Sequence, residues 1–215
     1  MGRYFATFEE AWSFFLTRDA PLEEFFGQLP DHESYILCWL LPFDRSLVPQ
    51  IRTAQRSFAA LGWITPQPEH FLHTSIAAVA VSARPPRADE IAAAAEAARR
   101  AWSDVQPFEV HYRRVNCFHD AVVVEVSGDG PKTLVERLVD ERTVDTVDPE
   151  VFLPHVTIGA FNERGDASAL RQALTQVRDL DVGTQHVGEA TLCLVPASRS
   201  TILSPWETVG RVQFV

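Results

Sequence analysis

Two short segments of this chain share one pattern: FLHTSI at residues 71–76 and LPHVTI at residues 153–158. Each approaches a histidine through apolar residues, leaves one position between, places a hydroxyl residue next and continues with isoleucine. Both lie in apolar, strand-like runs, and side chains two positions apart in a strand point to the same face of the sheet. The pattern therefore predicts one imidazole beside one hydroxyl group, presented twice.

The residue types in this pattern suit chemistry on a phosphate. His73 is expected to share a strand face with Ser75, and His155 with Thr157. Histidine can act as a base or an acid near neutral pH. Hydroxyl groups can donate hydrogen bonds to phosphoryl oxygens as charge rearranges. Acid–base chemistry on a phosphate needs a base, an acid and such donors. The sequence leaves open which histidine is the base.

A third histidine also precedes a hydroxyl residue by two positions. The sequence His32-Glu33-Ser34 lies in a polar turn that begins at Pro30, not inside an apolar strand. We therefore interpret it as a chance match.

The chain reads as two similar halves, each with its histidine in the central strand. Each half has the order strand, helix, histidine strand, helix, strand, which predicts two lobes of one unit over residues 34–215. In the first half we expect strands at about 35–41, 70–81 and 107–116, with helices at 45–61 and 88–102. In the second half we expect strands at about 121–126, 151–161 and 186–195, with helices at 131–142 and 166–178. Residues 199–215 are expected to add a terminal strand or hairpin.

An aromatic segment precedes the repeated unit and is assigned to residues 1–33. Phe8, Trp12 and Phe15 recur at the spacing of one helical face, which predicts one or two short helices packed on the main body. A lid or a dimer contact is the alternative interpretation.

Composition narrows the classes of partner. The formal net charge is −10 and the pI is about 5.1, which disfavours a long nucleic acid but leaves a small nucleotide or an RNA end. The chain has no close-spaced cysteine pair and no carboxylate cluster, so we expect no metal and no cofactor. It also lacks a signal-like N-terminus and a run of about 18 apolar residues, so we expect a cytoplasmic location and no membrane partner. The sequence makes no prediction of the oligomeric state.

The paired motifs resemble those of the 2H phosphoesterase superfamily, which includes 2′-5′ RNA ligase-like proteins and cyclic nucleotide phosphodiesterases. The resemblance covers roughly residues 34–212, with Pro154 directly before the second histidine typical in style. It implies an α+β fold with a bilobal pseudo-twofold duplication. Two mostly antiparallel sheets would face a central cleft, with helices outside.

The resemblance also implies roles for particular residues. His73 and His155 match the catalytic histidines of the family, and Ser75 and Thr157 match its phosphate-binding hydroxyl residues. Ser75 stands where threonine is common. Many relatives carry a basic residue soon after the second motif, where this chain has Ala160 and Phe161.

Five further residues are weaker candidates for the site. Arg113 or Arg114 is a candidate phosphate clamp, although a solvated face is the plainer interpretation. His70 is a candidate ligand contact. Trp39 and Phe161 are candidates to stack a base, with burial in the core as the alternative.

The leading functional prediction is a metal-independent phosphodiesterase. It would hydrolyse a 2′,3′-cyclic phosphate, or a related cyclic or 2′-5′ linkage, on a nucleotide or RNA end. The alternatives are a 2′-5′ RNA ligase or 2′-5′ oligonucleotide phosphodiesterase and, from a different class, a non-catalytic nucleotide-binding module.

Overall fold

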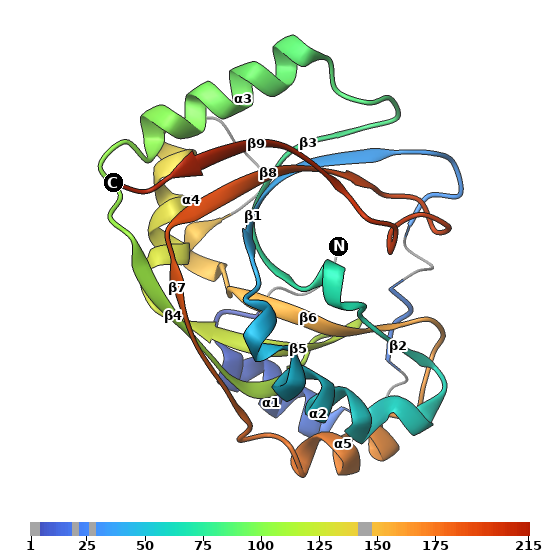
Figure 1. Cartoon of the computed structure of the whole chain (residues 1–215). Helices are drawn as coiled ribbons and strands as arrows, with labels where there is room; N and C mark the ends of the chain where they lie inside the picture. The colour runs from blue at the N-terminus through green and yellow to red at the C-terminus, as the bar shows by residue number, and fades with distance from the viewer. Residues whose placement is uncertain (1–4, 19–21, 26–28, 142–147) are drawn as a thin grey trace.

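The computed structural model describes residues 5–18, 22–25, 29–141 and 148–215 (Figure 1). The helices are α1 (Phe8–Thr17), α2 (Val48–Phe58), α3 (Ala88–Ala101), α4 (Gly130–Asp140) and α5 (Ala167–Thr175). The strands of the first half are β1 (Tyr35–Pro42), β2 (Ile64–Pro66), β3 (His73–Ser82) and β4 (Phe108–Cys117). Those that follow are β5 (Ala121–Ser127), β6 (His155–Phe161), β7 (Asp181–Val187), β8 (Glu189–Pro196) and β9 (Glu207–Gln213). The α+β class is confirmed.

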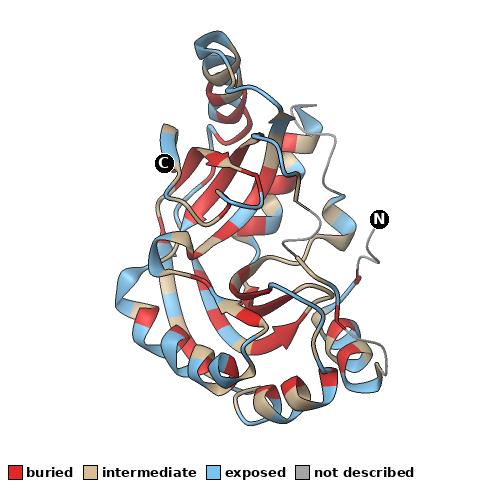
Figure 2. Ribbon diagram, turned by 90° about the vertical axis from the view of Figure 1, so that its right-hand side faces the viewer, coloured by how far each residue is buried: buried red, intermediate tan, exposed pale blue. Residues whose placement is uncertain are grey.

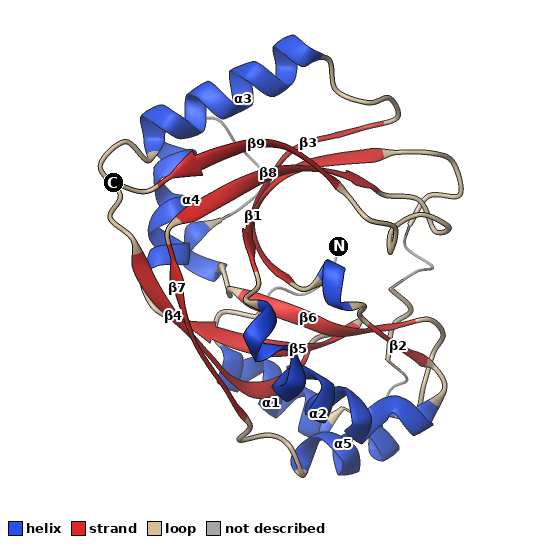
Figure 3. Cartoon of the chain, in the orientation of Figure 1, coloured by secondary structure: helices blue, strands red, loops and turns tan. Residues whose placement is uncertain are grey.

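The strands form one curled antiparallel sheet rather than two separate sheets (Figure 3). Their order is β7-β4-β5-β6-β3-β1-β8-β9, with β2 paired to β6. The two lobes meet where β3 pairs with β6 through one residue pair, Thr74 with Val156. This narrow junction makes the sheet continuous while leaving each lobe its own set of strands.

The helices exchange lobes as the chain proceeds. Helix α2 follows β1 of one lobe but packs against β6, β7 and α5 of the other. Helix α4 follows β5 and packs against β3 and α3 of the opposite lobe as well as against β4, the neighbour of β5. Figure 2 shows exposed residues concentrated on the outer helices and buried residues in the strands. Strands exchange as well, because β4 of the first half pairs with β5 and β7, and β8 of the second half pairs with β1. The expectation that each half of the sequence forms one lobe is therefore wrong.

One predicted strand is two strands in the structure. We expected a single strand at about 186–195, whereas β7 pairs with β4 and β8 pairs with β1. The two are separated by Gly188, where the chain passes from one lobe to the other. Strand β7 buries only Val182 and Val187, and its polar sequence, DVGTQHV, gives no apolar run that would predict a strand.

Helix α1 packs firmly on the main body. Ala11 and Phe15 are buried, and the amide of Asn116 on β4 donates to the Phe8 carbonyl over 2.9 Å. At the other end, Arg171 of α5 donates to the carbonyls of Phe15 and Arg18. Of the segment assigned to residues 1–33, positions 1–4, 19–21 and 26–28 lie outside the described residues. Within the part of the chain that the structure describes, no helix is long and apolar enough to cross a membrane.

Candidate active site

The two histidine strands lie side by side at the junction of the lobes. Each begins just after a short 3-10 turn, Glu69–Phe71 before β3 and Pro149–Val151 before β6. The paired residues Thr74 and Val156 are fully buried. In an antiparallel pair, directly opposed residues point to the same face. The positions on either side of Thr74 and Val156 therefore share the opposite face.

That opposite face carries all four motif residues. By the register of the junction, His73 lies across from Thr157, and Ser75 across from His155. Both histidines and Thr157 are half-buried, whereas Ser75 is exposed. The structure thus brings the two motifs together on one face of the sheet, which we call the motif face.

The two imidazoles are oriented by the same device. Nδ1 of His73 lies 2.7 Å from the carbonyl oxygen of Phe71, and Nδ1 of His155 lies 2.7 Å from that of Leu153. A carbonyl only accepts, so each Nδ1 must carry the donated proton. Each neutral ring therefore keeps the lone pair on Nε2, the atom available for proton transfer.

The Ser75 hydroxyl stands beside one of these nitrogens. Ser75 Oγ lies 3.1 Å from Nε2 of His73, and with the proton on Nδ1 the serine hydroxyl is the donor. A phosphate oxygen near Nε2 would compete for that hydroxyl proton. Thr157 places its own hydroxyl two residues after His155, as Ser75 does after His73.

Aromatic rings pack against both histidines, and two of them, Trp206 and Phe118, lie outside the motifs. The ring of His73 meets Trp206 edge to face at 4.9 Å and 88°, and Phe71 at 5.4 Å. The ring of His155 meets Phe118 at 4.9 Å and 75°. Trp206 lies just before β9 and Phe118 in the β4–β5 turn, so no spacing in the sequence links them to the motifs.

Burial keeps both histidines neutral at neutral pH. Burial, together with the neighbouring His155, lowers the pKa of His73 to about 4, and the bond to the Phe71 carbonyl opposes this in part. Burial also lowers the pKa of His155, opposed in part by the bond to the Leu153 carbonyl. An anionic phosphate placed between the rings would raise both pKa values, because opposite charge favours the protonated form.

Two weaker candidates are corrected by their burial. Trp39 packs against Trp102 at 4.9 Å and is 1% exposed. Phe161 packs against Trp63 at 5.3 Å and is 0% exposed. Neither ring is accessible to stack a base, so the core interpretation is the right one for both.

The remaining candidates lie away from Nε2 of the histidines or have other partners. Arg114 pairs with Glu9 of α1 at 3.3 Å and has a left-handed backbone with φ 64°. Arg113 is exposed on β4, which β5 separates from β6. Nε2 of His70 bonds to the carbonyl of Leu203 at 3.0 Å, which ties down the segment before Trp206.

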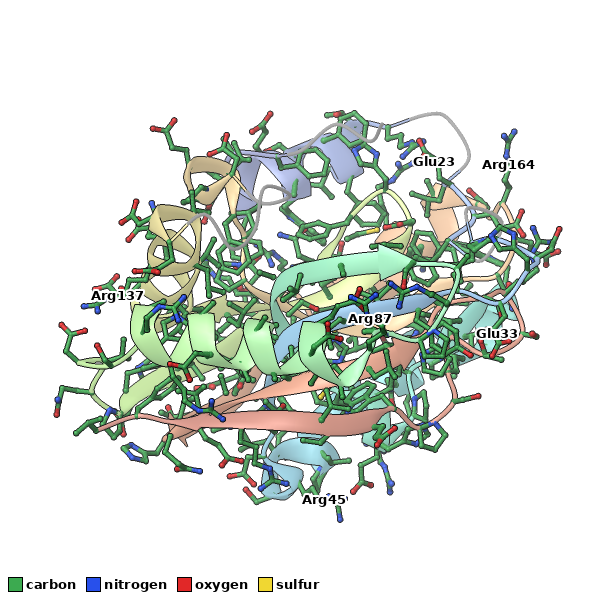
Figure 4. The ribbon with its side chains drawn as sticks, turned by 90° about the horizontal axis from the view of Figure 1, so that it is seen from above. Glu23, Glu33, Arg45, Arg87, Arg137 and Arg164 are labelled. Atoms are coloured by element: carbon green, nitrogen blue, oxygen red, sulfur yellow. The ribbon has the colours of Figure 1, made fainter. Side chains whose placement is uncertain are left out.

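Most charged side chains lie at the periphery, with the largely buried pair of Glu125 and Arg178 as an exception. In Figure 4, Arg45 and Arg164 point away from the body of the molecule. Arg137 pairs with Asp104, and Arg87 pairs with Asp89 at 3.0 Å. Across the residues that the structure describes, no group of three or more His, Cys, Asp or Glu side chains is arranged to hold a metal ion.

Comparison with known proteins places this geometry in a family. A sequence profile of the 2′-5′ RNA ligase superfamily matches residues 44–192, more than half of the chain. No curated protein sequence matches.

Solved structures share the fold. TT0787 of Thermus thermophilus is 14% identical with a TM-score of 0.61, covering 83% of this chain and 97% of that one. LigT of E. coli complexed with ATP is 17% identical with a TM-score of 0.61, covering 85% and 99%. LigT complexed with 3′-AMP is 14% identical with a TM-score of 0.59, covering 85% and 99%. The profile match, together with the paired histidine strands, identifies this chain as a member of the 2′-5′ RNA ligase superfamily.

Proposed function

We propose that this protein is a metal-independent phosphodiesterase that hydrolyses a 2′,3′-cyclic phosphate, or a related cyclic or 2′-5′ linkage, on a nucleotide or RNA end. The observation that carries the proposal is the matched pair of imidazoles. Each has its proton fixed on Nδ1 by a carbonyl at 2.7 Å and keeps the lone pair on Nε2 for proton transfer. Family membership and the nucleotide complexes of LigT support a nucleotide as the ligand class.

The proposed reaction uses the two Nε2 atoms in opposite protonation states. The neutral ring takes a proton from water, whose oxygen attacks phosphorus. The bond from phosphorus to the 2′ or 3′ oxygen breaks, and the protonated ring gives that oxygen its proton. The net change is the addition of one water molecule. Bound phosphate supplies the negative charge that allows one buried histidine to be protonated.

The hydroxyl groups and the aromatic rings have supporting roles in this proposal. Ser75 and Thr157 donate to the non-bridging oxygens as charge moves onto them. The half-buried rings of Phe71 and Trp206, 5.1 Å apart, supply apolar surface for a base beside His73. A single phosphodiester carries one negative charge, which two histidines and two hydroxyl groups can balance without a cluster of arginines.

A turnover screen tests the proposal. It should offer 2′,3′-cyclic mononucleotides, cyclic dinucleotides, 2′-5′ oligoadenylate and RNA ending in a cyclic phosphate. We expect hydrolysis of at least one substrate with a cyclic or 2′-5′ linkage, lost in His155→Ala and retained in His32→Ala, whose histidine lies in the exposed turn. Tight nucleotide binding without turnover, unchanged in His73→Ala, would contradict the proposal and favour the non-catalytic module.

A second candidate is 2′-5′ ligation, which the family profile favours by its description. Ligation is the reverse of cleavage at the same bond, so it would use the same Nε2 atoms with their acid and base roles exchanged. Incubating RNA halves with defined 2′,3′-cyclic phosphate and 5′-hydroxyl ends distinguishes the two. A joined 2′-5′ product supports ligation, and conversion to a monoester end alone supports hydrolysis.

A further inference from the structure

The turn between β4 and β5 lies against one of the two histidines. It spans residues 118–120 and is closed by a hydrogen bond from the Phe118 amide to the Ala121 carbonyl at 2.9 Å. The ring of Phe118 meets the ring of His155 edge to face at 4.9 Å. Phe118 therefore contacts the imidazole whose Nε2 the proposed reaction uses.

The N-terminal segment, residues 5–18, packs against this turn. Phe8 stacks on Phe118 at 6.3 Å with an interplanar angle of 11°, and Phe5 lies 6.1 Å from the same ring. Phe5 also stacks on His119 at 4.9 Å, and Phe14 meets His119 edge to face at 5.1 Å. The ring of Phe118 is thus held between two aromatic residues of the N-terminal segment and His155.

Polar contacts fix the N-terminal segment on the same strands. The buried amide of Asn116 donates both to the Phe8 carbonyl, at 2.9 Å, and to the Glu125 carboxylate, at 2.8 Å. Glu125 also accepts from Arg178 at 2.5 Å, and the guanidinium of Arg178 lies 4.6 Å from the ring of Trp12. Glu125 is the cross-strand partner of His155. These contacts describe a docked element rather than a lid.

We propose that Phe118 is a positioning residue for His155 and that the N-terminal segment, through Phe8, holds it there. The inference rests on the proposed function for its catalytic meaning. Phe8 lies outside residues 44–192, the part matched by the family profile, so this support is built from sequence beyond that match. The ring of His73 packs edge to face against Trp206 instead of Phe118. The pKa of His73 is therefore an internal reference for that of His155.

The arrangement has two physical consequences. Without the ring of Phe118, the imidazole of His155 gains room to turn about its side-chain bonds, and water reaches its edge. Looser orientation lowers kcat more than it raises KM, because it acts on proton transfer rather than on binding. Entry of water raises the pKa of His155 toward its ordinary value, because burial is what lowers it. The other titratable groups near it are His73 and its cross-strand partner Glu125, which is paired with Arg178, and the substitution removes none of them.

The test compares Phe118→Leu and Phe8→Leu with Leu16→Ala, a control on the exposed side of the same helix. We would titrate the ring protons of His155 and His73 by NMR and measure kcat and KM on the substrate found in the screen. We expect Phe118→Leu to raise the pKa of His155, leave that of His73 unchanged, and lower kcat about tenfold or more. Phe8→Leu should act in the same direction with a smaller effect, Phe118→Tyr should restore most of kcat, and Leu16→Ala should match the parent.

Unchanged titration of His155 in Phe118→Leu would overturn the inference. So would an equal shift of both histidines, since that would indicate a general loosening of the fold. Because Phe8 is only half-buried, its leucine variant provides the same test if Phe118→Leu does not fold. The titration needs no turnover, so a protein that cleaves none of the screened substrates would contradict the proposed function without deciding the position of His155.

Discussion

His73 on β3 and His155 on β6 each donate from Nδ1 to the carbonyl two residues earlier, but the aromatic rings packed against them come from different parts of the chain. His73 meets Trp206, near the C-terminus, whereas His155 meets Phe118, which the N-terminal segment supports. The bond from Nδ1 to the backbone carbonyl is local, so it occurs in both copies of the motif. The aromatic support depends on distant sequence, and each lobe obtains it in its own way.

The hydroxyl groups mark a second difference. Ser75 is exposed and bonded to Nε2 of His73 at 3.1 Å, whereas Thr157 is half-buried beside His155. A threonine side chain has fewer rotamers than serine because its Cβ is branched. The comparison suggests a more preorganised donor on β6 and a more adjustable one on β3.

Removing either imidazole should have the largest effect on kcat. We expect His73→Ala and His155→Ala each to lower kcat by a factor of about 10² to 10⁴, the usual range for one general acid or base. Steady-state kinetics on the substrate found in the screen measures this. The exposed His32 gives the matched control, and His32→Ala should retain parental activity. Near-parental kcat in either motif variant would rule out a two-histidine mechanism.

Removing a hydroxyl group should have the next largest effect on kcat. Ser75→Ala and Thr157→Val each remove one donor to a phosphoryl oxygen, which we expect to lower kcat by about 10². Exchanging the two types, as Ser75→Thr and Thr157→Ser, should cost only a fewfold because the donor remains. If the exchanges are as damaging as the deletions, shape rather than hydrogen bonding sets the role of these residues.

The aromatic partner of His73 offers a smaller, lobe-specific effect. We expect Trp206→Leu to lower kcat about tenfold and to raise the pKa of His73 while leaving that of His155 unchanged. NMR titration of both rings measures whether only the pKa of His73 changes. A shift of both pKa values would mean that Trp206 supports the whole junction rather than one histidine.

Acid should weaken the fold through the same residues. The pKa of His73 is about 4 in the folded protein, below the ordinary value near 6.5, so the unfolded chain binds the extra proton first. The free energy of unfolding should therefore fall as the pH drops from about 6.5 to 4, by up to about 1.4 kcal/mol per pH unit from this group. His155 contributes with the same sign.

Urea unfolding across this pH range, comparing the parent with His73→Asn, checks the prediction. The variant lacks the titrating ring, so its stability should depend less steeply on pH. An equal dependence in both proteins would show that His73 is not held neutral by the fold.

Chelation should change nothing. The proposed reaction moves protons between water and two imidazoles and needs no Lewis acid. We therefore expect EDTA to leave kcat and KM unaltered in the parent and in the variants on β3 and β6. Activity that EDTA abolishes and added divalent metal restores would contradict the proposed chemistry.

Sequence alone predicted the family, the α+β class and most elements, because apolar periodicity and the two motifs are local signals. It did not predict the exchange of α2 and α4 between lobes or the division of β7 from β8, which depend on pairing between distant segments. Trp39 and Phe161 were candidates to stack a base because the sequence does not show whether an aromatic residue of a strand faces the core or the site. Phe118 and Trp206 were missed because only the fold brings them to a histidine.

The most direct test of the central claim is whether both imidazoles serve one phosphate. We would add 3′-AMP to the protein near pH 7 and follow the ring resonances of His73 and His155 by NMR. Both should shift together along one saturation curve, and the pKa of each should rise in the complex. A response from one ring alone, or from neither, would contradict a shared two-histidine site.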